Sequence, residues 1–179
     1  MKTVKSEILG IIIVGFITTP LFAQNPKNMS LSLDPIMLAG GSIPLTFQAK
    51  VSERLSLSIS GYDKVYSFTK TKLLGVGGGL GAKFHLSAPG FEDGWYIRPE
   101  AMLGLWTIGD MPNRSQALSL EPRLMAGYDW IWHNGLSVGL GLGIKYVYFG
   151  GNPASVQDFS NFGFHDFFPN ADISVGWAF

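Results

Sequence analysis

The sequence predicts an all-β fold, an eight-stranded antiparallel up-and-down barrel that spans a membrane and follows a cleavable signal peptide. Segments of about ten residues that alternate between apolar and polar recur along the chain, and we count eight of them. After the N-terminal segment, no apolar run approaches the roughly 20 residues that a membrane-spanning helix needs. A chain that spans a bilayer without helices must close its sheet, because lipid offers backbone groups no hydrogen-bond partner.

The N-terminal segment has the pattern of a secretory signal peptide. Lys2 and Lys5 precede an apolar run from Ile8 to Ile17, and Ala23 provides a small residue before the expected cleavage site. We therefore assign residues 1–23 to the signal peptide and residues 24–179 to a single barrel domain. The chain contains no Cys, so it can form neither a disulfide nor a lipid-anchored Cys.

The predicted strands are bounded by turn residues, and apolar side chains occupy every second position in each. The first is the weakest, because Asp34 and Pro35 break its alternation. Pro35, Pro99 and Pro122 each lack a backbone N–H, so we expect a bulge or a strand end at each of them. The strands are 29–38, 43–50, 55–62, 74–86, 95–107, 118–130, 136–148 and 171–179.

The gaps between these strands set the orientation. With both termini in the periplasm, short turns lie on the inner side and longer loops on the outer side. The inner turns are then 51–54, 87–94 and 131–135, and the outer loops are 39–42, 63–72, 108–116 and 150–168.

Aromatic residues gather at the predicted inner end of the strands, as in the aromatic girdles that face lipid at a membrane interface. Trp95, Trp130, Trp177 and Phe179 form this group. The last strand places Ile173, Val175, Trp177 and Phe179 on its apolar face and ends on the aromatic residue.

The polar rows are predicted to face the lumen. The alternative is a soluble, lipocalin-like barrel with an apolar interior, but rows made mainly of Gly and Ser are too weakly charged for a soluble exterior. Turning a membrane barrel inside out would place Arg98, Arg123 and Lys145 in hydrocarbon at about 2–4 kcal/mol each.

Charged residues on the polar rows must satisfy one another, because an eight-stranded barrel has room inside only for side chains. We expect Arg98 and Arg123 to bridge Glu121 and Glu100, and glycines on the flanking strands to leave space for these long side chains. The predicted lumen network is Lys83, Arg98, Glu100, Glu121, Arg123, Lys145 and Asp172. It forms a structural salt-bridge plug or, as an alternative, a path for protons or ions.

Motifs for chemistry are weak. His85-Leu86-Ser87 is similar to the His-x-Ser spacing of outer-membrane phospholipase and lipid A deacylase enzymes, but alternation turns both side chains inward. His133 and His165 fall on opposite sides of the membrane, so no metal site is expected, and no cofactor motif is present. With 15% charged residues and a net charge of +0, nothing favours nucleic acid binding.

The pattern and the ending Trp177-Ala178-Phe179 resemble small eight-stranded outer-membrane barrels of the OmpA, OmpX and OmpW type, although Ser174 replaces a frequent Gly. The resemblance implies a nonenzymatic protein of the outer membrane of a Gram-negative-type bacterium. It also implies that the barrel-assembly machinery reads the C-terminal strand.

Three functions stay open. The first is a structural or surface-contact role with a plugged lumen, in which the phenylalanine-rich loop 150–168 contacts an extracellular ligand. The second is a narrow conduit or binder for small hydrophobic molecules, with an apolar cavity near Met102 and Trp106. The third is a lipid hydrolase that uses His85 and Ser87.

Overall fold

A computed structural model describes residues 27–39, 42–68, 71–108, 115–150 and 166–179. The predicted signal peptide, residues 1–23, lies outside them. The elements are β1 (Met29–Leu33), α2 (Pro35–Ala39), β2 (Leu45–Ser52), β3 (Leu55–Phe68), β4 (Thr71–His85), β5 (Gly94–Ile108), β6 (Ser115–Ile131), β7 (Leu136–Tyr146), β8 (Tyr148–Gly150) and β9 (Phe167–Ala178).

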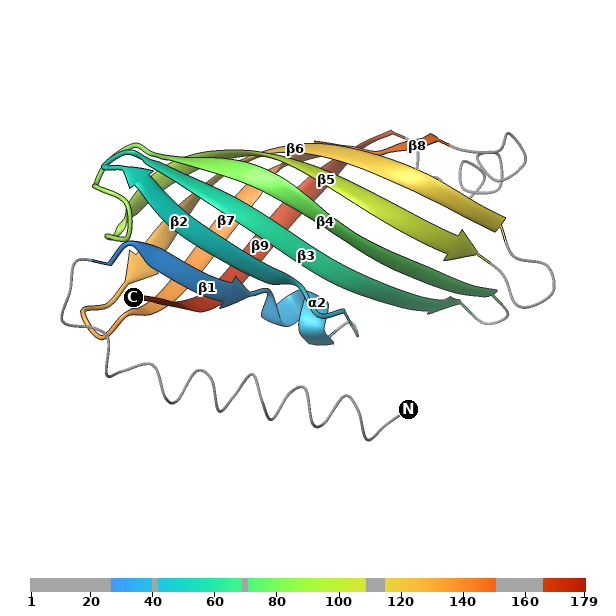
Figure 1. Ribbon diagram of the computed structural model, residues 1–179, viewed down its shortest axis with the longest axis horizontal. Helices are drawn as coiled ribbons and strands as arrows, with labels where there is room; N and C mark the ends of the chain where they lie inside the picture. Colours follow the sequence, from blue (N-terminus) through green and yellow to red (C-terminus); the bar gives the residue numbers. More distant parts are fainter. Residues whose placement is uncertain (1–26, 40–41, 69–70, 109–114, 151–165) are drawn as a thin grey trace.

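The strands form one closed antiparallel barrel, shown from the side in Figure 1. The sheet runs from β5 through β4, β3, β2, β1, β9 and β7 to β6, and β6 pairs again with β5. β8 continues β7 along β6, so the two form one strand of the wall. The described part of the chain therefore confirms the predicted eight-stranded barrel.

The apolar rows face outward. Leu142 on β7, Leu80 on β4 and Leu103 on β5 are 72%, 68% and 64% exposed. Alternate positions such as Arg98 and Glu121 are buried inside. Because the exterior carries the large aliphatic side chains and the interior carries the charges, the barrel has the inverted polarity that a bilayer requires.

The first strand is shorter than predicted. β1 ends at Leu33, and the backbone N–H groups of Ile36 and Met37 donate to Asp34 Oδ1 at 2.8 and 3.0 Å. Asp34 is thus the N-cap of α2, and Pro35 takes the first helical position, which needs no N–H donor. The predicted strand 29–38 is wrong from Asp34 onward. No helix in the described residues is long and apolar enough to cross a membrane.

The wall is taller on one side than on the other (Figure 1). The predicted loop 63–72 is largely strand, because β3 and β4 stay paired as far as Phe68 and Thr71. In contrast, β1 pairs with β9 only as far as Leu33, and β2 pairs with β3 only as far as Leu45. We call β1 and β2, with α2 between them, the short side of the wall.

Two prolines lie within strands. Pro99 pairs with Leu124, and Pro122 with Ala101, in an unbroken β5–β6 register, so the expected bulge or strand end is wrong for both. Instead, each missing N–H group affects the pairing with the strand on the opposite side. Pairing between β4 and β5 is interrupted beside Pro99, and β6 changes partner from β7 to β8 beside Pro122. Only Pro35 follows a strand end as predicted.

Candidate functional site in the barrel lumen

The lumen is filled by three layers of side chains along the barrel axis. The layer nearest Met29 and Phe179, which we call the basal layer, contains Ser56, Lys83, His85 and Asp129. A central charge layer follows, made of Arg98, Glu100, Glu121, Arg123 and Asp172. Beyond it lies an aromatic layer of Tyr62, Met102, Trp106, Ala117, Val147 and Phe149, with Phe168 packed against it.

The central charge layer is held by ion pairs. Arg123 contacts Glu121 at 2.8 Å and Glu100 at 3.7 Å, and Arg98 contacts Asp172 at 2.6 Å. The predicted bridge from Arg98 to Glu121 or Glu100 is wrong, because the strand register sets Arg98 opposite Met125. The same register sets Arg123 opposite Glu100, so Arg98 reaches across the lumen to β9 instead.

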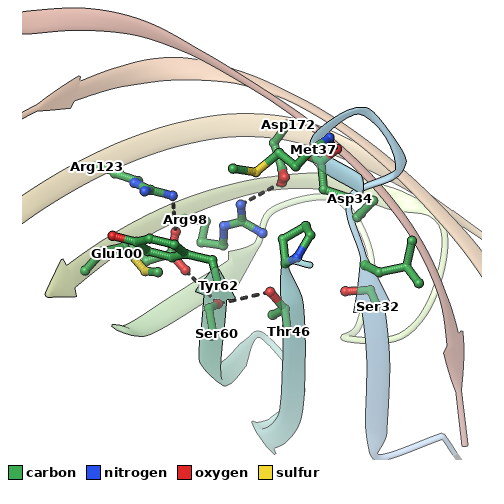
Figure 2. A pocket seen from close by; sticks show the side chains of 15 residues that line it. Ser32, Asp34, Met37, Thr46, Ser60, Tyr62, Arg98, Glu100, Arg123 and Asp172 are labelled. Atoms are coloured by element: carbon green, nitrogen blue, oxygen red, sulfur yellow. Dashed lines mark hydrogen bonds and ion pairs between the residues drawn. The ribbon is translucent and has the colours of Figure 1, made fainter. Parts of the chain in front are cut away.

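Hydroxyl groups satisfy the remaining carboxylate oxygens. Ser60 donates to Glu100 at 2.9 Å and shares a 3.0 Å hydrogen bond with Thr46 (Figure 2). Tyr62 and Ser119 each donate to Glu121 Oε1 at 3.3 Å. Such donors are what keeps a buried carboxylate from being destabilising.

In the basal layer, Lys83 and Asp129 form a buried ion pair of 2.7 Å, and the Lys83 ammonium lies 4.1 Å from the centre of the Tyr96 ring. Alternation alone places Asp129 inside, but the predicted network omits it. Lys83 lies on β4 and Asp129 lies on β6, with β5 between them in the sheet. A rule that pairs only residues on neighbouring strands therefore does not predict this contact. Lys145 lies opposite Arg123 in the register and forms no ion pair with a described residue.

His85 and Ser87 are not partners. His85 is buried, and its Nε2 is 2.9 Å from Ser56 Oγ. Ser87 is exposed, contrary to the predicted inward direction, and its Oγ accepts from the Trp95 N–H at 2.8 Å. A His that cannot reach the hydroxyl does not activate it as a nucleophile.

The aromatic layer is continuously packed. The Trp106 ring lies 6.5 Å from Tyr62 and 6.4 Å from Phe149, measured between ring centres, and Met102 is 2% exposed. Inward glycines of β4 provide the space, because a Cβ added to Gly75 would come within 2.6 Å of the Trp106 ring. The flanking glycines therefore make room for Trp106 and not, as expected, for Arg98 and Arg123, and dense packing lies where an apolar cavity was the alternative.

A small cavity of about 60 Å³ lies between the central charge layer and the short side of the wall (Figure 2). We call it the polar chamber. Its walls include Thr46 and Ser60 as well as the charged side chains Asp34, Arg98, Glu100, Arg123 and Asp172.

The predicted girdle residues lie at the end of the barrel where β5 begins and β9 ends, with Trp95 and Trp130 exposed and Trp177 and Phe179 half-buried. Trp95 and Trp130 contact Tyr128 with ring centres 5.3 and 4.9 Å apart, and the strand register sets Trp177 beside Leu136. Trp132, which the sequence prediction omits, is also exposed there. Of the predicted assembly residues, Ile173, Val175 and Trp177 lie on β9, and the Phe179 N–H donates to the Met29 carbonyl at 2.8 Å. Their position relative to a bilayer stays a prediction.

No group of three or more His, Cys, Asp and Glu side chains within the described ranges could hold a metal ion. Comparison of the chain with protein-family models and with curated proteins gives no match. Among solved structures, it is similar to the N-terminal β-barrel domain of Pseudomonas aeruginosa OprF, with a TM-score of 0.59 and 13% sequence identity. The similarity covers 87% of this chain and 100% of that one. The shared feature is the fold, a small closed β-barrel.

Proposed function

We propose that the protein is a nonenzymatic barrel of the outer membrane of a Gram-negative-type bacterium, with a lumen closed by side chains and a structural or surface-contact role. The observation that carries the proposal is the polarity of the wall. Large aliphatic side chains cover the outside, and paired charges fill the inside. This arrangement is stable in lipid and unfavourable in water.

The closed lumen follows from the layers in series. The aromatic layer leaves Trp106 and Phe149 only 6% and 3% exposed, and the central ion pairs cross the lumen beneath it. An ion that moved along the axis would have to separate buried ion pairs, at a cost of several kcal/mol for each charge left unpaired.

The test is single-channel conductance and dye leakage of the refolded protein in liposomes. We expect neither steady conductance nor leakage. The double variant Y62A/W106A removes two rings of the aromatic layer and should still carry no steady current, because the central ion pairs and the Lys83–Asp129 pair remain in series with it. Steady conductance of the unchanged protein would contradict the closed lumen.

The surface role is assigned to the outer loops, of which residues 151–165 lie outside the described part. At the C-terminal edge of loop 150–168, Phe167 is 67% exposed, and its ring centre is 4.9 Å from that of Tyr146. Exposed aromatic side chains at a rim suit contact with another molecule. The dense packing at Met102 and Trp106 disfavours the alternative of a conduit for small hydrophobic molecules.

The C-terminal strand is the proposed signal for the barrel-assembly machinery. Phe179 is suited to a test by side-chain removal, because its backbone carbonyl accepts from the N–H groups of Asn28 and Met29 and these bonds survive substitution. We expect F179A to refold in detergent but to accumulate less in the outer membrane of cells. The matched control is F47A, an outward Phe on β2. Equal cellular levels of the two variants would contradict the signal.

A further inference from the structure

The polar chamber lies against the lowest part of the barrel wall. Leu33 ends β1, Pro44 precedes β2 and Met37 belongs to α2, and all three line the chamber. The same side contributes Asp34, which Figure 2 shows beside Met37 and Asp172. The boundary of the chamber toward the outside is therefore one short helix and two strand ends, with no continuous strand pair across it.

Two donors in the chamber walls lack an acceptor among the described residues. The Nε–H groups of Arg98 and Arg123 are buried and make no hydrogen bond with a described residue, and Arg98 as a whole is 9% exposed. A buried donor without an acceptor is costly, and water is the usual partner where a cavity is polar and large enough. A volume of about 60 Å³ has room for roughly two water molecules, at about 30 Å³ for each.

Both axial directions from the chamber are obstructed. Toward the far end, the aromatic layer places Tyr62 and Met102 directly above it. Toward the basal layer, Tyr96 is 1% exposed and the Lys83–Asp129 ion pair lies inside the lumen. At the end of the barrel, Phe91 is 4% exposed and has the only positive φ of a non-Gly residue among those described, 67°.

We propose that the polar chamber is a hydrated binding site for small solutes of neutral or positive charge, and that it opens sideways, beneath α2, rather than along the barrel axis. The charge preference follows from three carboxylates, Asp34, Glu100 and Asp172, against two guanidinium groups in its walls. The Asp34 cap holds α2 over the opening, so the helix acts as its cover.

Cysteine accessibility tests the proposal cleanly, since the chain contains no Cys. Ser60→Cys places a thiol in the wall of the polar chamber. Ser119→Cys places a thiol in the aromatic layer next to Trp106, at a position where the Ser is only 1% exposed. Ser52→Cys, at the exposed end of β2, gives the rate without obstruction. The refolded barrels are treated with cationic aminoethyl methanethiosulfonate or its anionic sulfonatoethyl analogue. In each case the thiolate forms a mixed disulfide and releases methanesulfinate.

We expect the cationic reagent to label Ser60→Cys in the folded barrel, more slowly than Ser52→Cys and faster than the anionic reagent does. Ser119→Cys should react only after unfolding in urea. Equal protection of Ser60→Cys and Ser119→Cys would overturn the side opening. Rapid labelling of both would show an axial path, which contradicts the closed lumen of the proposed function as well. Preference for the anionic reagent would overturn the charge assignment.

The role of α2 is tested by adding Asp34→Ala to Ser60→Cys. Loss of a helix cap weakens the first turn by about 1 kcal/mol, which corresponds to a roughly fivefold faster labelling rate. The matched control is Asp34→Asn, which also loses the carboxylate charge but keeps a capping oxygen, so the fivefold difference is expected between Asp34→Ala and Asp34→Asn. Equal rates with and without the cap would overturn the role of α2 as the cover. Retained binding of both variants to outer-membrane fractions would show that this effect is separate from membrane location.

Discussion

At the level of single residues, the lumen is stable only because each described charge of the central charge layer has a partner of the opposite sign within 4 Å. Lys145 lies next to this layer, opposite Arg123, and has no ion pair in the described region. The sequence places these charges inside correctly, because strand alternation has a period of two. It does not give their partners, because Arg98–Asp172 and Lys83–Asp129 cross the lumen between strands that are not adjacent.

Replacing Asp129 by Ala should destabilise the barrel strongly. The substitution leaves the Lys83 ammonium buried without its carboxylate, and breaking a buried ion pair from one side costs about 3–5 kcal/mol. Urea unfolding in detergent, followed by tryptophan fluorescence, measures the free energy of unfolding. The double variant K83M/D129L removes both charges and should lose less. A single variant that is as stable as the double one would show that leaving the Lys83 ammonium without its carboxylate costs nothing.

At the level of elements, local sequence chemistry decides where strands end more strongly than alternation does. Asp34 and Pro35 start a helix within an apparently alternating segment, because a cap followed by a residue without an N–H favours the first helical turn. Conversely, β3 continues to Phe68 and β4 already begins at Thr71, in a segment where the sequence suggests a loop. Hairpin pairing between long neighbouring strands overrides the weak turn signals there.

The glycine row of β4 gives a prediction for this level. A Cβ at Gly77 would collide with the Leu103 carbonyl and approach Tyr62 Cζ at 2.7 Å, so G77A should lower the free energy of unfolding by about 1–3 kcal/mol. The matched control is G61A on β3, where the nearest atom, the Gly77 carbonyl oxygen, is 3.9 Å away. Both are measured by urea unfolding, and equal losses would show that the space beside Tyr62 is not needed.

At the level of the whole molecule, the polarity of the wall was predictable from the sequence, and so was the number of strands. The unequal height of the wall was not. It arises from β1 stopping at Leu33 while β5 and β6 stay paired through Ile108 and Ser115, and alternation carries no information on where neighbouring strands stop together. The polar chamber follows from that difference in height and therefore appears only in the structure.

A charge on the outer wall tests this polarity. L142R places a guanidinium at the position of a side chain that is 72% exposed in the middle of the apolar exterior. In liposomes we expect it to lower the free energy of unfolding by about 2–4 kcal/mol. V51R, at the exposed end of β2, is the control and should cost only about 0–1 kcal/mol, as for a position near the membrane interface. Equal effects of the two variants in liposomes would place Leu142 outside the hydrocarbon.

The pairing of β1 with β9 joins segments from opposite ends of the chain, with Leu31 beside Trp177. Closing so long a loop is entropically unfavourable and slow, and it cannot begin until synthesis has delivered the last strand. A polypeptide whose synthesis stops before residue 167 would lack β9 and would have two unpaired edge strands, β1 and β7. Exposed edges of this kind pair with other chains, so an unfinished copy would be prone to aggregation.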